Sequence, residues 1–563
     1  MPTFLPDLPM RITWKQFERY WYVFSLGVII ASLPFSKLLL SIGQMMLAGG
    51  WIVERFNAGR LFARLSSLSF QKRALQVVPY SVYLLFAGIF KGFREFYRQK
   101  PALVFSSIFI LHIAGLLLTS DFDYAVKDLR TKFPLFLLPL ILSTSKAFDE
   151  KGFYRYLMLF VAAVLVRSLF NTWLIAAHDY VDIRDVSRNI SHIIFSLLLS
   201  LCIFILAHFL FQKKNFPGWL KALFLLLIVW FLVYLVISQS FTGLSITLIS
   251  LLALIPLMIL TIRNSRIRAG LLFSIILIAI AIVVSFRSVV KDYYHVNPVD
   301  LTKLDTVTSR GNPYIHNITS TQTENGNYVW LYIQWDEMRG TWNKRSRFPF
   351  DSLDLKNQTV AHTVVRYLTS KGWRKDADAL EKLTDMEVFA IEKGVANYVF
   401  LDEFSVRGRI YEFLSGYDIY RKTGNPTGST VMQRIEFWKA SLGIIHDSWL
   451  TGVGTGDMNK VFAAQYKKMD SKLAPDQRWR SHNQFLSIWI GFGIFGLAWF
   501  LIALFYPPVM MKRMNDYFVI ILLIITILSM LTEDTIESQT GVTFFALFYS
   551  LFLFARFSRQ KMN

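Results

Sequence analysis

The sequence predicts an all-α, polytopic membrane protein with about twelve transmembrane helices and one large, mainly helical loop domain. Hydrophobic residues make up 54% of the chain, which exceeds the share of about 45–50% that is usual for soluble domains. These residues gather in runs, and a run of about 20 apolar residues is long enough to cross a bilayer as a helix. Basic residues gather between the runs, which is the pattern of the positive-inside rule.

The charge of the chain fits a membrane protein better than a nucleic-acid-binding protein. The formal net charge is +21, and in a soluble protein such an excess would suggest nucleic acid as a partner. Here the basic residues flank apolar runs, so membrane lipids are the expected partner and nucleic acid is not. The lone Cys202 lies in an apolar run and has no second cysteine for an internal disulfide. Residues 1–20 are polar and basic, so we expect no cleavable signal peptide.

Twelve apolar segments are candidates for spanning helices. They cover residues 21–35, 36–53, 101–119, 133–146, 152–176, 190–211, 219–238, 241–261, 270–287, 483–506, 517–532 and 541–556. The stretch 78–90 is apolar as well. Basic residues flank it closely, so we expect it to lie at the membrane interface.

The distribution of charge predicts an orientation in the membrane. If the N-terminus is cytoplasmic, the strongly basic loops all fall on the cytoplasmic side, as the positive-inside rule requires. The loops on the opposite side are acidic or mixed, namely 121–132, 179–188 and 533–537. We therefore expect both termini in the cytoplasm.

One long polar stretch, residues 289–481, interrupts the apolar runs. Long domains cross the membrane largely regardless of their charge, so it is expected to form a folded extracytoplasmic domain. The chain then divides into N-terminal transmembrane helices (1–288), this loop domain (289–481) and C-terminal transmembrane helices (482–563). Within the loop, 376–399 and 431–446 are expected to be helical, and glycines at 452–456 to form a turn.

The most informative local motif is Arg478-Trp479-Arg480-Ser481-His482-Asn483, where the long loop returns to the membrane. A titratable imidazole beside cations at an interface suits chemistry on an anionic, lipid-borne substrate. The alternative interpretation is a basic, aromatic anchor for a helix end, with His482 as its cap.

A second motif surrounds Arg434 and Glu436, with Gly452–Asp457 downstream. The planar guanidinium of Arg434 matches the geometry of phosphate oxygens, although it could equally form an ordinary ion pair on a helix surface. The glycines fit the pattern GxGxG, but no GK[ST] follows and no strand precedes them. A nucleotide-binding loop is therefore not supported.

A third group of polar residues, Arg184, Arg188 and His192, lies at the outer mouth of a predicted span. Charged groups at membrane depth are expensive and tend to be functional, whereas at the rim they can extend to water.

A fourth group is the short outer loop that contains Glu533, Asp534 and Glu537. Its carboxylates could bind a metal ion, orient an arginine or simply face water. No HExxH, CxxC or DxD motif stands out in the sequence, so we expect neither a metal nor a cofactor.

Together these features give the chain a resemblance to the O-antigen ligase family, which shares its core with the O-antigen polymerases. The resemblance rests on the predicted helices with one late loop, on Arg434 to Asp457, on His482-Asn483-x-x-Leu486 with Gly491 to Leu497, and on Ser238 to Leu244. The block Thr363–Asp376 is similar to a Bacteroidetes-type branch of the family.

The resemblance implies a glycosyltransferase of the GT-C type that transfers a glycan from undecaprenyl diphosphate to a lipid A-core sugar hydroxyl. It implies an inverting reaction without a metal, in which arginines neutralise the diphosphate and a histidine activates the acceptor. His482 is the candidate catalytic base. The candidate donor-binding residues are Arg188, Arg434, Arg478 and Arg480, and the candidate supporting residues are Asn483, Arg184, Glu533 and Glu537.

One position departs from the family pattern. Many family members carry an arginine where this chain has Phe241. Arg188 is the nearest topological substitute, since it is also expected at an outer membrane face.

Three other functions remain open. An O-antigen polymerase uses the same donor with a second lipid-linked repeat as acceptor, and a protein O-oligosaccharyltransferase uses a serine or threonine hydroxyl. A lipid or polysaccharide transporter would be expected to show inverted repeats or broken helices near the midplane. Under each of these hypotheses, we expect the chain to lie in a bacterial inner membrane with the loop in the periplasm.

Overall fold

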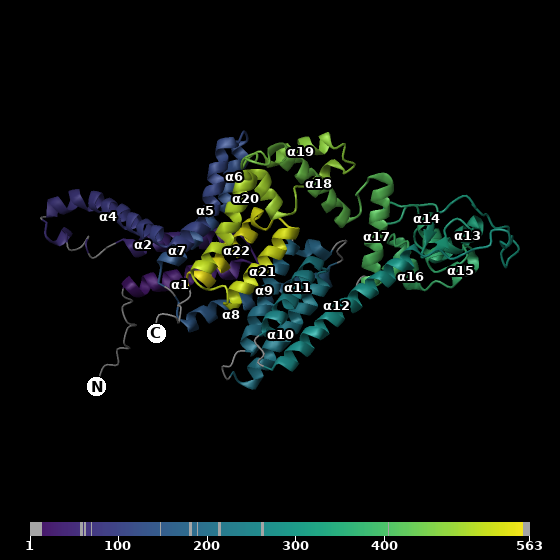
Figure 1. The fold of residues 1–563 in the computed structure, drawn as a ribbon, viewed down its shortest axis with the longest axis horizontal. Coiled ribbons are helices and arrows are strands. Elements are labelled where there is room, and N and C mark those ends of the chain that lie inside the picture. The colour runs from purple at the N-terminus through teal and green to yellow at the C-terminus, as the bar shows by residue number, and fades with distance from the viewer. Residues whose placement is uncertain are drawn as a thin grey trace, which may run out of the picture. The chain divides into compact units, whose positions relative to one another are not determined.

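The computed structural model describes residues 14–56, 60, 64–68, 70–146, 148–178, 183–187, 190–211, 216–260, 264–402 and 405–555. Most of the described residues lie in helices (Figure 1). Within these ranges the only sheet is a two-stranded hairpin. The predicted all-α, membrane-type architecture is confirmed at this level.

The chain forms two compact units that do not follow its linear order. Unit 1 comprises Met1–Leu257, Glu436–Ser471 and Pro475–Asn563, and unit 2 comprises Met258–Ile435 and Lys472–Ala474. The stretch 436–471, which the sequence assigns to the loop domain, thus packs with the N-terminal and C-terminal helices. The functional division into 1–288, 289–481 and 482–563 stays a prediction.

Unit 1 is a helical bundle. Its helices up to residue 260 are α1 (Trp14–Ser32), α2 (Lys37–Arg55), α4 (Phe70–Arg98), α5 (Lys100–Ala114), η1 (Gly115–Leu118), α6 (Phe122–Lys132), α7 (Pro134–Thr144), α8 (Glu150–Ala177), η2 (Ile183–Ser187), α9 (His192–Phe211), α10 (Gly218–Ile237) and α11 (Phe241–Leu260). Later in the chain follow α18 (Thr430–Ser448, which starts in unit 2), α19 (Met458–Lys468), η4 (Pro475–Gln477), α20 (Gln484–Met510), α21 (Tyr517–Thr532), η5 (Thr535–Glu537) and α22 (Gln539–Leu553).

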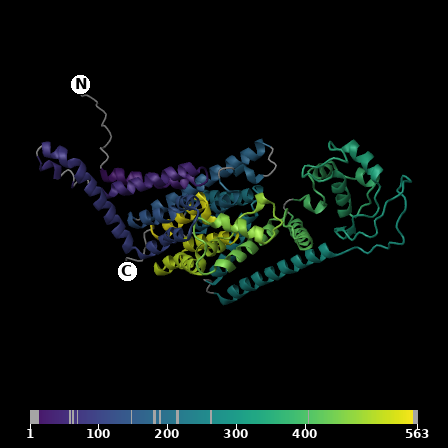
Figure 2. The same ribbon diagram turned by 90° about the horizontal axis from the view of Figure 1, so that it is seen from above.

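The short helix α22 lies at the centre of unit 1. Every residue from Thr540 to Leu553 is buried, and in Figures 1 and 2 the yellow C-terminal helices lie among the blue N-terminal ones. Aromatic rings join it to α5: Phe105 stacks on Tyr549 with ring centroids 4.0 Å apart. Since offset-stacked aromatic pairs add roughly 0.5–1.5 kcal/mol to area burial, this contact helps to fix α5 against the last helix.

Seven described helices are long and apolar enough to cross a membrane. They contain the segments Gln76–Arg98, Lys100–Leu118, Glu150–Ala177, His192–Phe211, Gly218–Ile237, Ser265–Tyr294 and Gln484–Met510. Three further apolar helices are shorter, namely Phe241–Pro256, Tyr517–Thr532 and Gln539–Leu553. The predicted number of about twelve spans is thus not confirmed.

Several predicted segments differ in the structure from the spanning helices expected. The segment predicted at 133–146 is the 11-residue helix α7, and the segments at 21–35 and 36–53 lie in α1 and α2, which pack along each other. The stretch 78–90, expected at the interface, lies inside α4, where 76–98 forms one continuous apolar helix.

Unit 2 contains one long apolar helix and a small polar-surfaced fold. Its elements are α12 (Ser265–Tyr294), β1 (Thr323–Glu324), β2 (Asn327–Tyr328), α13 (Trp335–Arg345), α14 (Val360–Ser370), α15 (Ala377–Glu381), α16 (Asp385–Glu392), η3 (Tyr398–Phe400) and α17 (Val406–Thr423). Trp342 and Tyr367 are fully buried in its core.

The predicted helix at 376–399 is wrong, because the chain breaks it into α15, α16 and η3. Thr384 and Glu387 form a capping box that starts α16 anew, which satisfies the free N–H groups of a helix start. Gly394 follows α16 with φ of 75°, a conformation that ends helices. The helix predicted at 431–446 is confirmed as α18.

The buried indole of Trp342 gives a test of the unit 2 core. Trp342→Ala removes a side chain that is 1% exposed, and such truncations cost about 3–5 kcal/mol. We expect the free energy of unfolding of unit 2 to fall by this amount. The measurement is the susceptibility of the full-length protein to a protease at increasing denaturant concentration. Phe389 is 54% exposed, so Phe389→Ala serves as the control; equal losses in both variants would contradict the packing.

Candidate functional site

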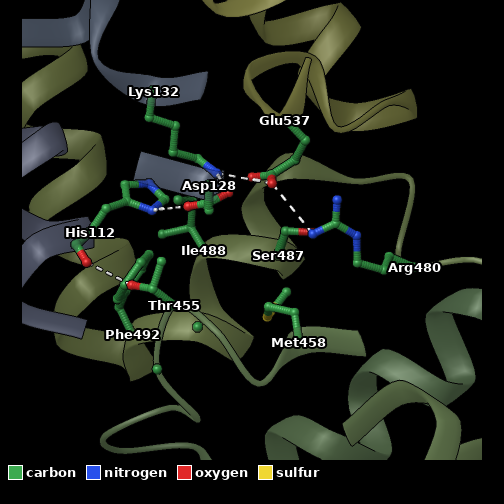
Figure 3. Close-up of a pocket in the computed structure, with 12 residues that line it drawn as sticks. His112, Asp128, Lys132, Thr455, Met458, Arg480, Ser487, Ile488, Phe492 and Glu537 are labelled. Carbon is green, nitrogen blue, oxygen red and sulfur yellow. Dashed lines mark hydrogen bonds and ion pairs between the residues drawn. The ribbon is translucent and has the colours of Figure 1, made fainter. Parts of the chain in front are cut away.

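A pocket opens in unit 1 where segments from four parts of the chain meet (Figure 3). The lining residues come from α5 and α6, from the glycine loop with the start of α19, from the start of α20 with the loop before it, and from η5 before α22. The lining residues are His112, Asp128, Lys132, Gly454, Thr455, Met458, Arg480, Ser487, Ile488, Gly491, Phe492 and Glu537.

A chain of charged side chains runs along the pocket. Asp128 and Lys132 lie one turn apart on α6 and form an ion pair. The Nζ atom of Lys132 also donates to Oε2 of Glu537 at 2.9 Å, and Nη1 of Arg480 lies 3.4 Å from the same oxygen. Two cations and two anions therefore balance each other, as buried charges must.

The surroundings keep all four groups ionised. Burial alone would raise the pKa of Asp128 and of Glu537, but the ammonium of Lys132 outweighs it and lowers both. Burial alone would lower the pKa of Lys132 and of Arg480, but the carboxylate of Glu537 outweighs burial and raises both pKa values. Since an opposite charge within a few ångströms favours the ionised form, the network stays charged at neutral pH.

His112 lies at one end of this network. Its Nδ1 atom is 3.3 Å from Oδ2 of Asp128, and its ring meets the ring of Phe492 edge-on, with centroids 4.7 Å apart. The side chain of His112 is almost completely buried. The pocket thus holds an imidazole from α5 beside a carboxylate from α6. α5 belongs to a segment that is long and apolar enough to cross a membrane, as the sequence predicted.

The glycine loop before α19 is joined to α20 through main-chain atoms. α20 is broken at Gly493, where φ is 67° and ψ is −173°. The carbonyls of Ile490 and Gly491, next to this break, accept hydrogen bonds of 2.9 Å from the N–H groups of Val453 and Gly454. Backbone groups freed inside an apolar helix need such partners.

Glycine is required in this loop because two backbones approach closely. A Cβ atom on Gly452 would lie 2.5 Å from the carbonyl of Gly491, and one on Gly454 would lie 2.8 Å from the carbonyl of Gly115. Both glycines also have positive φ, 73° and 87°, which other residues adopt at a cost. The GxGxG pattern therefore serves main-chain packing; α18 ends at Ser448, and the glycines that were predicted to form a turn lie in a non-helical loop.

Side chains complete the attachment of this loop to α5 and α6. The hydroxyl of Thr455 donates to the carbonyl of His112 at 2.6 Å. The carboxylate of Asp457 accepts from the N–H and the hydroxyl of Ser120 at 2.8 and 2.7 Å. The loop thus fixes the last turn of α5, which carries His112.

His482 lies outside the lining of the pocket, on the loop that enters α20. Its Nδ1 atom is 3.0 Å from Oε2 of Glu533, its ring stacks on Phe437 with centroids 5.4 Å apart, and its side chain is 28% exposed. Its φ of 46° is uncommon for a residue with a side chain. Asn483, rather than His482, caps α20 by accepting from the N–H groups of Phe485 and Leu486.

The loop 533–537 contacts the entry to α20 through all three of its carboxylates. Glu533 meets His482, and Asp534 accepts from the hydroxyls of Ser481 and Ser487 at 3.2 and 2.7 Å. Glu537 binds Lys132 and Arg480 as described above. From the sequence, this loop could bind a metal ion, orient an arginine or face water. In the structure its Glu537 pairs with Arg480 and its Glu533 contacts His482.

The other predicted cations are spread over the chain. Arg478 donates to the carbonyl of Ser471 at 3.1 Å, and Arg434 belongs to unit 2. Arg188 and the side chain of Arg184 lie outside the described residues. Phe241 begins α11 and is 43% exposed. Of the three predicted donor-binding arginines that the structure describes, only Arg480 lines the pocket.

His112, Asp128 and Lys132 were not predicted from the sequence as site residues. The signals were present, because His112 is an ionisable residue inside an apolar run and such residues are functional candidates by default. Asp128 and Lys132 stand four residues apart, the spacing of an ion pair on one helix face. Across the described ranges, no three histidine, cysteine or carboxylate side chains form a group that could hold a metal ion.

The fold and the pocket define a mostly helical, polytopic membrane protein with a buried, charge-balanced site. Residues 383–501 match the family model described as O-antigen ligase. No curated protein matches the chain. The match includes Gly454, Arg480, His482 and the first part of α20, whereas the α5–α6 residues and the loop 533–537 lie outside it.

The break at Gly493 gives a test of the main-chain junction. Gly493→Ala would place a Cβ atom against the carbonyl oxygen of Leu450 and force alanine to a φ of 67°. We expect the unfolding midpoint in detergent to fall, because crowding and the left-handed backbone conformation lower the free energy of unfolding by about 3 kcal/mol. Gly491→Ala is the matched control, since its nearest neighbours would lie at 3.9 and 4.0 Å. An unchanged midpoint for Gly493→Ala would contradict the junction.

The carboxyl of Asp534 gives a test of pH dependence. Burial raises its pKa above the ordinary 3.8, against the attraction of Arg480. The folded protein therefore holds this proton to higher pH than the unfolded chain, so the carboxyl's contribution to stability falls as pH rises from about 4. Asparagine can accept the same hydrogen bonds, so Asp534→Asn is expected to be more stable than wild type at neutral pH and equal to it at about pH 3.

The measurement is the denaturant midpoint in detergent over a pH series. Asp476 is exposed, so Asp476→Asn is the control and should follow wild type throughout. A lower midpoint for Asp534→Asn at neutral pH would show that the ionised carboxylate stabilises the fold.

Proposed function

We propose that this protein is an O-antigen ligase, a glycosyltransferase of the GT-C type that moves a glycan from undecaprenyl diphosphate to a hydroxyl of a lipid A-core sugar. The observation that carries the proposal is the composition of the pocket. The family-matched segment contributes Arg480, the Gly454–Met458 loop and the start of α20 to it. A lipid-linked donor suits a pocket in a membrane protein, because it arrives already activated.

The charged residues suit the departure of a diphosphate. Negative charge grows on the leaving group in the transition state, and fixed cations in a water-poor site stabilise that charge. Arg480 lines the pocket and shares its charge with Glu537, while its planar guanidinium carries five N–H donors. Lys132 adds a second fixed positive charge. The proposed reaction therefore draws its electrostatic stabilisation from side chains and uses no metal ion.

His482 is the proposed base for the acceptor. Glu533 faces Nδ1 at 3.0 Å, which favours the tautomer with its proton on Nδ1 and leaves Nε2 as the basic nitrogen. In the proposed step Nε2 takes the hydroxyl proton, the acceptor oxygen bonds to the anomeric carbon, and the bond from that carbon to the diphosphate oxygen breaks. Attack opposite the leaving group inverts the anomeric centre.

The remaining predicted residues have subordinate places in the proposal. Asn483 caps α20 and supports the loop that carries His482. Arg188, Arg184, Arg434 and Arg478 remain candidates for contacts with the donor glycan or its diphosphate.

The proposed location is the bacterial inner membrane, with both termini in the cytoplasm and the long loop in the periplasm. The charge pattern of the loops supports this orientation. Transfer at the periplasmic face then needs no nucleotide, since the lipid-linked glycan is itself the activated donor.

Two other acceptors use the same chemistry. A polymerase would join the glycan to a second lipid-linked repeat, and a protein O-oligosaccharyltransferase would use a serine or threonine hydroxyl.

Deletion of the gene in its native host separates these functions. Lipopolysaccharide and total glycoprotein are resolved on gels beside the lipid-linked glycan pool. Loss of all O-chain with accumulation of lipid-linked polymer supports the ligase. A single repeat left on the core indicates a polymerase, and missing protein glycans with intact lipopolysaccharide indicate a protein transferase. No change in any pool overturns the transferase proposal and favours a transporter.

Variants of His482 test the proposed base. His482→Ala is expected to lower the rate of transfer by about 10²–10⁴-fold, the usual contribution of a general base, in an assay with purified protein, lipid-linked glycan and rough lipopolysaccharide. Glu533→Gln is expected to fall between this variant and wild type. His446 has an 88% exposed side chain, so His446→Ala is the control. Full activity of a well-folded His482→Ala would remove His482 from the mechanism.

A further inference from the structure

His112 is a buried polar group whose ring makes no well-directed hydrogen bond. Its residue is 3% exposed. Its Nδ1 atom faces Oδ2 of Asp128 at 3.3 Å, but within the described part of the chain this contact lacks the geometry of a hydrogen bond, and Nε2 makes no hydrogen bond either. More than nine in ten buried polar groups in proteins are satisfied. A pair of facing groups left open toward a pocket therefore indicates a polar ligand.

The ring of His112 is held in this position. Phe492 packs edge-on against it at 4.7 Å, and the hydroxyl of Thr455 binds the main-chain carbonyl of the same residue. Figure 3 shows the imidazole beside Asp128, on the opposite side of the pocket from Arg480. The two open groups are thus presented to the pocket by packing from α20 and the glycine loop.

The charge balance of the pocket limits what this ligand can be. Lys132 and Arg480 already compensate Asp128 and Glu537. A further ion bound at His112 would stand uncompensated in a buried site, which is costly. The ammonium of Lys132, next to both carboxylates, also disfavours a metal ion there. A neutral group that can both donate and accept a hydrogen bond fits this end of the pocket.

We propose that His112 and Asp128 form a hydroxyl-binding subsite, which holds a hydroxyl group of a sugar while the glycan is transferred. The hydroxyl donates to Oδ2 of Asp128 and accepts from a ring N–H of His112. No bond to the sugar is made or broken at this subsite, so both residues position the substrate. The inference rests on the proposed function, because it takes the ligand to be a sugar of the donor glycan or of the acceptor.

Such a subsite would contribute to specificity. A site built to pair with a hydroxyl discriminates strongly against a sugar that lacks it, because its buried polar groups are then left unpaired. When the subsite is empty, its unpaired groups lower the stability of the protein, as is common where function requires an unsatisfied group.

The test is a binding measurement on the full-length protein in detergent, with rough lipopolysaccharide and undecaprenyl-diphosphate-linked glycan as separate probes. His112→Phe keeps an aromatic ring against Phe492 but removes both nitrogens. We expect it to bind one of the two probes about tenfold more weakly, the effect of a lost hydrogen bond in a desolvated site. The probe that is affected tells whether the hydroxyl belongs to the acceptor or to the donor.

Two further variants separate this role from a structural one. Ser106→Ala alters another buried polar residue of α5 that does not line the pocket, and it should bind both probes as wild type does. His112→Gln, which can still donate and accept, should recover part of the affinity. His112→Phe should unfold at the same temperature as wild type or a higher one, because it removes an unpaired buried group.

The outcomes decide the subsite and the proposed function separately. Equal affinity of wild type and His112→Phe for both probes overturns the subsite and assigns the space beside His112 to water, whatever the transfer assay gives. Wild-type protein that binds a probe but transfers no glycan to any acceptor overturns the proposed function. In that case weaker binding by His112→Phe still supports the subsite. Failure of wild type to bind either probe overturns both.

Discussion

The pairing of the Lys132 ammonium with Glu537 is the interaction on which the rest of the site depends. Lys132 is 1% exposed at the side chain, and a buried cation is tolerable only where anions and hydrogen bonds replace its water. Glu537 supplies this and also orients Arg480, while Asp128 pairs with Lys132 on the same helix. One carboxylate thus ties α6, the loop before α22 and the loop before α20 into a single arrangement.

Main-chain contacts provide the second constraint. α20 is broken at Gly493, and the glycine loop supplies N–H donors to the carbonyls next to the break. The same loop holds the end of α5 through Thr455. Because these contacts use backbone atoms, their requirement is for small residues and positive φ. The pocket is therefore framed by the main chain and charged by side chains.

Much of the architecture followed from the sequence, because long apolar runs and basic flanks are local signals. The spans at α5, α8, α9, α10, α12 and α20 were found in this way. The helix predicted at 376–399 failed because a capping box and a glycine divide it, and apolar periodicity does not register such breaks. The segments predicted as spans at 133–146 and 541–556 are the short helices α7 and α22, which have 11 and 15 residues.

The site was predictable only in part, for the same physical reason. Arg480, His482 and the carboxylates of 533–537 stand in conspicuous polar motifs close to membrane entry points. His112, Asp128 and Lys132 gain their meaning from contacts with residues more than three hundred positions away. A single sequence without its fold gives no measure of such proximity. Arg434 and Arg478 look similar to Arg480 in the sequence, yet only Arg480 faces the pocket.

The pairing of Lys132 with Glu537 also sets an order of assembly during synthesis. The ribosome makes Lys132 early, then all of unit 2, and reaches Glu537 only near the end of the chain. Until then the ammonium has Asp128 alone, and Arg480 lacks its carboxylate. A nascent or truncated chain therefore carries an unbalanced charge in a membrane setting, where such charges are costly. Synthesis of the loop 533–537 neutralises this charge, so the site reaches its charge balance only after that loop has been made.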